Sequence, residues 1–308
     1  MGDSLFPLSA SNEHRMGDPL DLPPLNIPKL IREFELHPNK WLGQNFLIDP
    51  TALESVVQAA NISERDVVLE IGPGLGSLTR YLAVLARTVV AIEIDPNLIA
   101  PLRKVTNQYR NIEIIQGDIL TLPVEKLIPS SNYLVVANIP YYITSAIIRR
   151  LLSTDNRPKR MILTVQYEVA KRICAMPGNL SLLALSVQVF GSPSLYARIP
   201  ASSFYPVPKV DSAIICIDLN LEPVIPIQSL DAFFSLAQAG FSQKRKTLRN
   251  ALSSGLHQKT NIVEEILLEA GIDPHRRAET INLAEWNSLT QLVINRFPEI
   301  SLRKVQTR

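Results

Sequence analysis

The sequence has few cysteines, no long apolar run and almost no net charge, and each absence narrows what the protein can be. Only Cys174 and Cys216 occur in 308 residues, without the spacing of metal ligands, so we expect a reduced, cytoplasmic setting and no metal. No stretch approaches the roughly 18 apolar residues of a membrane-spanning helix. The net charge of +2 means that any nucleic-acid-binding surface must come from local clustering of basic residues.

Residues 1–36 differ from the rest of the chain. They contain Pro19, Pro23, Pro24 and Pro28 with several acidic residues, and they show no apolar periodicity. A signal peptide would need a basic start and an unbroken apolar stretch, and a transit peptide would avoid acidic residues. The composition therefore predicts a mobile tail over residues 1–36.

From residue 51 onward, helical and strand patterns alternate. Helical spacing covers residues 51–60 and 77–86, and Asp49-Pro50 and Asp95-Pro96 are typical helix starts. Short apolar runs predict strands at residues 67–71, 88–94, 112–116, 133–137, 160–165, 185–190 and 213–219. Continuous apolar strands separated by helices indicate a mostly parallel sheet covered on both faces, which is an α/β, Rossmann-like fold.

The pattern changes after residue 221. Residues 222–226 contain two prolines and resemble a linker. Only helical periodicity follows, at residues 230–238, 246–253, 262–270 and 283–294. We therefore expect an α/β domain over residues 37–221 and a small all-helical domain over residues 222–308.

A glycine-rich turn follows the first predicted strand. Glu70 precedes Gly72, Gly74 and Gly76, which alternate with other residues before a helix begins. Glycines let the chain turn tightly and let a ligand approach the backbone, although a tight turn alone would also use them. A dinucleotide site has a different glycine spacing, which leaves room for phosphate. The alternating form is typical of methyltransferases, whose cofactor has no phosphate.

Acidic residues stand at the ends of the next two strands. Glu93 lies where an acid commonly meets ribose hydroxyls, and Asp118 ends the strand after that. Each alone would be an ordinary loop acid or helix cap. The carboxyl ends of parallel strands share one crevice, so together with the glycine turn they predict a nucleoside cofactor there.

A second motif follows the fourth strand. It reads Asn138-Ile139-Pro140-Tyr141. The amino nitrogen of adenine is a poor nucleophile because its lone pair is delocalised into the ring. The Asn138 side-chain oxygen and the Ile139 or Pro140 carbonyl can accept its two N–H bonds, and Tyr141 offers a ring for stacking. The pattern predicts catalysis by positioning and charge placement, although an ordinary capped turn would use similar residues.

At this point the chain resembles the bacterial small-subunit ribosomal RNA adenine dimethyltransferases over about residues 37–286. The resemblance rests on several ordered segments, at residues 42–47, 70–76, 93–95, 117–118, 138–145, 165–170, 204–212, 241–250 and 277–279. It departs at Tyr142, whose position is often Asn in that family.

The resemblance implies an enzyme with specific site residues. It implies that S-adenosylmethionine is held by Asn45, Leu47, Gly72, Gly74, Glu93, Asp118 and Asn138. Phe204 would be a second aromatic wall opposite Tyr141, against a flipped adenine. The family dimethylates N6 of two adjacent adenosines in a hairpin loop near the 3′ end of 16S rRNA. The implied partner is the rRNA of the pre-30S particle, bound by a monomer in the cytoplasm.

A basic cluster begins the helical domain. It contains Lys244, Arg245, Lys246 and Arg249, and no acidic residue lies between residues 240 and 260. Phosphate contact is the function that such a cluster favours, although many charge runs are only solvated helix faces.

Two other functions remain open from the sequence. One is the large-subunit rRNA adenine dimethyltransferase that confers macrolide resistance, which shares the Asn-x-Pro-Tyr loop. The other is a non-catalytic rRNA-binding assembly factor on the same fold. Residues 42–45 and 244–250 favour the small-subunit enzyme, and the intact glycine turn, Glu93 and Asn138 favour catalysis. A DNA adenine methylase is less favoured because its loop usually has a second proline where Ile139 stands.

Overall fold

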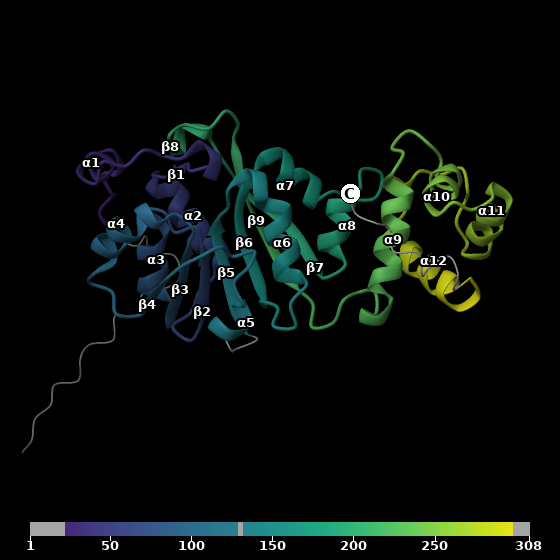
Figure 1. Cartoon of the computed structure of the whole chain (residues 1–308), viewed down its shortest axis with the longest axis horizontal. Helices are drawn as coiled ribbons and strands as arrows, with labels where there is room; N and C mark the ends of the chain where they lie inside the picture. The colour runs from purple at the N-terminus through teal and green to yellow at the C-terminus, as the bar shows by residue number, and fades with distance from the viewer. Residues whose placement is uncertain (1–21, 129–131, 298–308) are drawn as a thin grey trace, which may run out of the picture.

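The computed structural model describes residues 22–128 and 132–297 (Figure 1). Within these ranges, an α/β domain is followed by a group of helices at the far end of the molecule. This arrangement confirms the predicted fold class.

A seven-stranded sheet forms the centre of the α/β domain, in the order β4-β3-β2-β5-β6-β9-β7. Its strands are β2 (Val67–Ile71), β3 (Thr88–Glu93), β4 (Ile112–Gln116), β5 (Tyr133–Asn138), β6 (Arg160–Gln166), β7 (Gly191–Ile199) and β9 (Ser212–Leu219). The strands from β4 to β6 pair in parallel, whereas β9 is antiparallel to both neighbours. The carboxyl ends of β2, β3 and β5 therefore meet at one edge, as the sequence predicted.

Helices cover both faces of the sheet (Figure 1). They are α2 (Pro50–Ala60), α3 (Ser77–Leu85), α4 (Pro96–Thr106), α5 (Val124–Leu127), α6 (Thr144–Leu152), α7 (Tyr167–Ile173) and α8 (Leu182–Gln188). Val68 belongs to one apolar core and its neighbour Leu69 to the other. Successive side chains of a strand point to opposite faces, so burial on both faces explains the unbroken apolar runs.

The helix starts that lead into the site follow the expected capping chemistry. The Asp49 carboxylate accepts a hydrogen bond from the Thr51 amide at 3.0 Å, at the start of α2. Asp95 caps α4 in the same way through the Asn97 amide, also at 3.0 Å. Both helices have proline at their first position, where the missing amide costs no hydrogen bond.

The prediction of a strand at residues 185–190 was wrong. Residues 185–188 lie in α8 and residues 189–190 in the turn that ends it, and the Ser181 hydroxyl caps the helix by accepting from the Ala184 amide. A short buried apolar run fits a helix as well as a strand. The missed strand is β7, at the sheet edge, whose mostly exposed residues and Pro193 hide the strand pattern.

The tail prediction does not hold for residues 22–36. Helix α1 (Ile27–Glu33) packs on the domain through Ile27, which is fully buried with Phe46, Leu75 and Leu98. The Arg80 guanidinium also donates to the Pro23 carbonyl at 3.0 Å. Apolar contacts to Phe46, the glycine turn and α4, together with the hydrogen bond from α3, thus hold a segment that composition alone marked as a tail, while residues 1–21 lie outside the described ranges.

The C-terminal part contains the four helices that the sequence predicted. They are α9 (Leu230–Phe241), α10 (Leu248–Leu256), α11 (Thr260–Glu269) and α12 (Leu283–Arg296). Their core is Trp286, which is fully buried and packs edge-on against Phe233 and stacked against Phe241, with ring centroids 6.4 and 6.2 Å away. In the parts of the chain that the structure describes, no helix is long and apolar enough to cross a membrane.

Candidate active site

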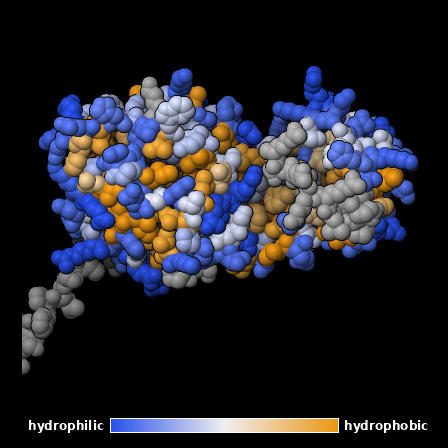
Figure 2. All heavy atoms as spheres, viewed as in Figure 1, coloured by the Kyte–Doolittle hydropathy of each residue, from blue (hydrophilic) through white to orange (hydrophobic). Residues whose placement is uncertain are grey.

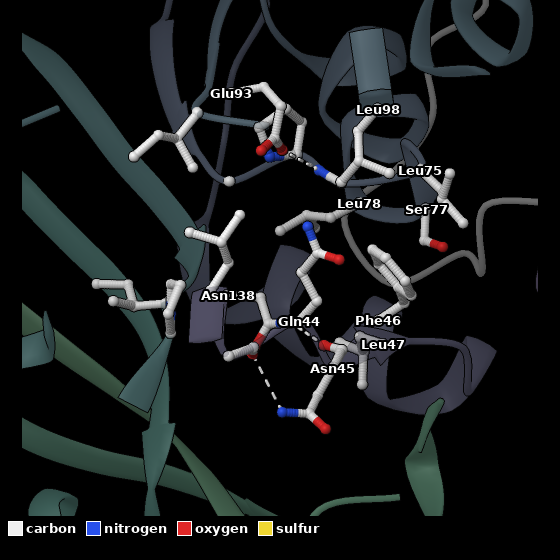
Figure 3. Close-up of a pocket in the computed structure, with 18 of the residues that line it drawn as sticks. Gln44, Asn45, Phe46, Leu47, Leu75, Ser77, Leu78, Glu93, Leu98 and Asn138 are labelled. Carbon is white, nitrogen blue, oxygen red and sulfur yellow. Dashed lines mark hydrogen bonds between the residues drawn. The ribbon is translucent and has the colours of Figure 1, made fainter. Parts of the chain in front are cut away.

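A cleft of about 770 Å³, including its opening to solvent, lies at the carboxyl ends of β2, β3 and β5. Its wall combines the glycine turn, the ends of β3 and β5, and an N-terminal segment that crosses the opening, residues 42–47. That segment is held by the short strand β1 (Phe46–Leu47), which pairs antiparallel with β8 (Phe204–Tyr205). Figure 3 shows Glu93 at one end of the cleft, with Asn138 and Asn45 at the other.

The glycine turn brings its backbone close to the cleft. Gly74 has a φ of +59°, and a Cβ there would lie 2.9 Å from the Phe46 ring. A side chain at this position would therefore be strained and would also displace a residue of the opposite wall. The close approach of the Phe46 ring, which lines the cleft, together with the positive φ, explains why this position needs glycine.

Glu93 connects the glycine turn to the start of α4. Its carboxylate accepts hydrogen bonds from the Gly74 amide at 3.0 Å and from the Asp95 amide at 2.9 Å. The residue is 3% exposed, and burial raises the pKa of its carboxyl although these two hydrogen bonds oppose the rise. A carboxylate fixed at the rim in this way is well placed to accept hydrogen bonds from ribose hydroxyls.

Glu70 lines the same end of the cleft, and its Oε2 is buried without a hydrogen-bond partner. Burial is the main cause that raises the pKa of its carboxyl to about 8, and the neighbouring Glu93 charge adds to the rise. Glu70 is therefore largely protonated at neutral pH. The sequence motif contained this residue but did not indicate that it would be neutral.

Asn138 lies at the end of β5 with its amide already oriented. The Asn138 Nδ2 donates to the Asn45 carbonyl at 3.0 Å, and the Asn45 Nδ2 donates to the Gly43 carbonyl at 3.1 Å. Because its amide nitrogen is used, the Asn138 Oδ1 is the atom left to accept from a substrate. No described residue donates to that oxygen. The structure thus brings Asn45 and Asn138 together in the wall of the cleft.

The two residues after Ile139 are also fixed by hydrogen bonds. The Pro140 carbonyl accepts from the Ile143 amide at 3.2 Å. The Tyr141 hydroxyl lies 2.7 Å from the Ser212 hydroxyl. Burial raises the pKa of the Tyr141 hydroxyl. Ser212 is fully buried on β9, so it holds the Tyr141 ring in place. Sequence reasoning gave Ser212 no role, because the contact spans 71 residues.

Two predicted residues are not in the cleft wall. Phe204 is 1% exposed and packs in the core, because its β8 position pairs with Leu47 and directs the ring inward. The expected role as an aromatic wall against adenine is therefore not supported by this geometry. Asp118 lies at the end of β4, but its Oδ1 accepts from the Leu120 amide at 2.9 Å, and the residue does not line the cleft.

Gln44 is a site residue that the sequence did not single out. Its Nε2 donates to Asp95 at 2.7 Å, and its Oε1 accepts from the Asn39 amide at 2.7 Å. These bonds fasten the N-terminal segment across the cleft to the start of α4. Its position next to Asn45 in the sequence could have indicated a role in the cleft. Residue spacing could not predict that its partner would be Asp95, at the start of α4.

The basic cluster divides into two parts. Lys244, Arg245 and Lys246 are exposed in the loop between α9 and α10, on the same side of the molecule as β1 and β8 in Figure 1. Hydrophilic residues project at that place in Figure 2. Arg249 instead pairs with Glu264 of α11 at 3.0 Å, so its predicted role in phosphate contact is not supported by this structure. Within residues 22–128 and 132–297, no group of acidic, histidine or cysteine side chains could hold a metal.

Comparison with known proteins identifies the family. The profile for ribosomal RNA adenine dimethylases matches residues 36–294. The chain belongs to the ribosomal RNA adenine dimethylase family. It is 43% identical over 262 residues to "Ribosomal RNA small subunit methyltransferase A" of Dehalococcoides mccartyi, covering 85% of this chain and 90% of that protein. The protein of the same name from Alkaliphilus oremlandii is 40% identical, covering 86% and 95%.

Two solved structures share the fold. A dimethyladenosine transferase from Plasmodium falciparum aligns with a TM-score of 0.70 and 28% identity, covering 81% of this chain and 98% of that one. The 23S rRNA methyltransferase ErmE aligns with a TM-score of 0.66 and 29% identity, covering 81% and 100%. This family member is therefore a methyltransferase with the class I fold.

Proposed function

We propose that this family member transfers methyl groups from S-adenosylmethionine to N6 of two adjacent adenosines near the 3′ end of 16S rRNA. Each adenosine would become N6,N6-dimethyladenosine while the small subunit matures. The observation that carries the chemistry is the Asn138 amide at the end of β5, oriented by Asn45 with its oxygen left to accept. The relatives named as small-subunit methyltransferases support the choice of RNA.

The residues around the glycine turn fit S-adenosylmethionine. Gly72 and Gly74 let a ligand approach the backbone, and Glu93 supplies acceptors for ribose hydroxyls. The buried, unpartnered Glu70 oxygen provides a further polar group in the wall. Asn45 and Leu47 close the cleft from the N-terminal segment. When bound, the cofactor supplies a methyl group on a positively charged sulfur.

The catalytic step rests on two acceptors at the end of β5. The Asn138 Oδ1 accepts one N–H of the adenine amino group, and a backbone carbonyl accepts the other. The Ile139 carbonyl suits this role better than that of Pro140, because the Pro140 carbonyl already accepts from Ile143. Two such bonds favour a tetrahedral nitrogen with its lone pair aimed at the methyl group. No strong base is needed beforehand, since the proton becomes acidic only after transfer.

Tyr141 supplies the ring on which the target base stacks. Its hydroxyl bond to Ser212 prevents the ring from turning away when the cleft is empty. Pro140 restricts the backbone of the same loop. The acceptors and the stacking surface are thus positioned together before RNA arrives, which lowers the entropy cost of the reaction.

The RNA-binding surface would include the exposed loop with Lys244, Arg245 and Lys246. These cations would contact phosphates outside the cleft. We further propose that the enzyme acts as a monomer on pre-30S particles in the cytoplasm. The two cysteines, which are both free, are consistent with such a reducing setting.

The competing substrate is the large-subunit RNA, because the ErmE structure has the same fold. The test is methyl transfer to immature 30S particles and, separately, to protein-free 23S rRNA, followed by analysis of the product nucleosides. We expect dimethyladenosine in 16S rRNA and no product in 23S rRNA. The opposite preference would favour the macrolide-resistance activity, and no transfer to either RNA would favour a non-catalytic assembly factor.

A further inference from the structure

Two large aromatic side chains beside the cleft are exposed. Trp41 is 90% exposed and Tyr142 is 59% exposed. The chain has only one other tryptophan, Trp286, and that residue is fully buried in the helical domain. Exposing a ring of this size to water is unfavourable, so it suggests a partner.

Both residues adjoin the cleft wall. Trp41 directly precedes Leu42, the first residue of the N-terminal segment that lines the cleft, and Tyr142 directly follows Tyr141. The Tyr142 ring lies against Gly43, where an added Cβ would be 3.4 Å from its Cδ1 atom. Consecutive Cα atoms are about 3.8 Å apart, so the Trp41 Cα lies within about 7.6 Å of the Gly43 Cα. The two exposed side chains therefore belong to the Asn138 loop and the N-terminal segment, the two segments that meet at this side of the cleft.

The proposed reaction creates a need for stacking at this place. A base that is flipped into the cleft leaves its neighbour without a stacking partner on that side. Single-stranded RNA bases commonly regain stacking on exposed aromatic side chains. The base next to the target must lie near the mouth of the cleft, since a single phosphodiester linkage joins the two nucleotides. An aromatic ring there would compensate for the stacking that is lost.

We propose that Trp41, together with Tyr142, forms a stacking platform for the unpaired base adjacent to the adenosine being methylated. The inference rests on the proposed function and adds the part of the substrate that this surface recognises. Tyr141 holds the reacting base, whereas Trp41 and Tyr142 hold its neighbour. The platform favours a purine neighbour, because a purine offers more surface for stacking than a pyrimidine.

The test measures how tightly the enzyme binds immature small subunits in the presence of S-adenosylhomocysteine, so that no chemistry occurs. Two kinds of particle are compared: one with both adjacent adenosines, and one in which uridine replaces the neighbouring adenosine. Trp41→Ala should weaken binding to the first particle by about 5- to 150-fold, the range of one lost base–aromatic stack. Its effect on the uridine particle should be several-fold smaller, and Trp41→Phe should restore part of the affinity.

Controls separate a stacking role from a general loss of structure. Tyr196→Ala removes an exposed ring on the edge strand β7, away from the cleft, and should leave particle binding unchanged. Affinity for S-adenosylhomocysteine and thermal stability should match wild type in Trp41→Ala, because the side chain is almost fully exposed.

The outcomes distinguish this inference from the proposed function. Equal weakening of both particles by Trp41→Ala would overturn the platform and indicate a contact to another part of the particle, such as a ribosomal protein. Unchanged binding of both particles would also overturn it. If wild-type enzyme methylates neither adenosine of the intact particle when given S-adenosylmethionine, the proposed function itself fails.

Discussion

The two ends of the cleft differ in how much of their hydrogen bonding is completed by the chain itself. At the cofactor end, both oxygens of Glu93 accept from backbone amides, and the residue is 3% exposed. At the substrate end, the Asn138 Oδ1 receives no bond from the described residues, and Trp41 is 90% exposed. Apart from the unpartnered Glu70 Oε2, the cofactor end is therefore preformed, whereas the substrate end presents groups whose partners must come from RNA.

This difference predicts that substitutions at the two ends affect different measurements. Changes at the cofactor end should alter cofactor affinity. Changes at the substrate end should alter methyl transfer or RNA binding, and should leave cofactor affinity nearly unchanged except at Asn138, which is also an expected cofactor contact.

The largest expected effect is that of Asn138→Ala. Without the Oδ1 acceptor, the lone pair of the amino nitrogen is not aligned, so the rate of transfer should fall by at least about 100-fold. Single-turnover methylation of immature 30S particles measures this rate. The control is Asn107→Ala, an exposed asparagine that ends α4, which should retain wild-type activity. A near-normal rate in a folded Asn138→Ala protein would refute the mechanism even if the family assignment stands.

An intermediate effect is expected from Glu93→Ala at the cofactor end. Loss of the ribose acceptors should weaken cofactor binding by on the order of 1–3 kcal/mol. Calorimetry with S-adenosylhomocysteine gives the affinity, and a melting curve checks that the loss of the bonds to Gly74 and Asp95 has not unfolded the protein. Glu93→Gln keeps one acceptor oxygen and should lose less. Unchanged cofactor affinity in folded Glu93→Ala would show that this carboxylate only stabilises the backbone at Gly74 and Asp95 and does not bind the cofactor.

The smallest effect is expected in the loop outside the cleft. Neutralising Lys244 and Lys246 should reduce the salt dependence of RNA binding by roughly 1–2 units of slope, since each phosphate contact contributes about one. Cofactor affinity should not change. Arg249→Gln is the comparison, because that side chain is paired with Glu264 and should affect stability more than the slope. The same salt dependence in the double variant and in wild type would mean that these lysines face solvent and do not contact RNA phosphates.

Much of the fold and of the site's core followed from local patterns. The apolar runs that became β2 and β4 and the caps at Asp49 and Asp95 depend on neighbours in sequence, so they were predicted with the right bounds. The strand-end positions of Glu93 and Asn138 followed from the order of the elements, because parallel strands place their carboxyl ends together.

What sequence did not predict depends on contacts between distant segments. Phe204 turned out to be buried because β8 pairs with β1, more than 150 positions earlier in the chain. Arg249 looked free because its partner Glu264 lies on the next helix. The roles of Gln44 and Ser212 come from bonds to Asp95 and Tyr141 on other elements. Residue type and spacing carry no direct information about such pairs.

The central claim is that the substrate end of the cleft holds the same adenine during two successive methyl transfers to its N6. After the first transfer only one N–H remains, so stacking on Tyr141 must help to hold the monomethylated base. The decisive measurement is mass spectrometry of nucleosides from 16S rRNA after reaction of immature 30S particles with excess S-adenosylmethionine. The wild-type enzyme should convert both adjacent adenosines to N6,N6-dimethyladenosine, and Tyr141→Ala should accumulate the monomethyl product. A wild-type reaction that stops at N6-methyladenosine would contradict the account.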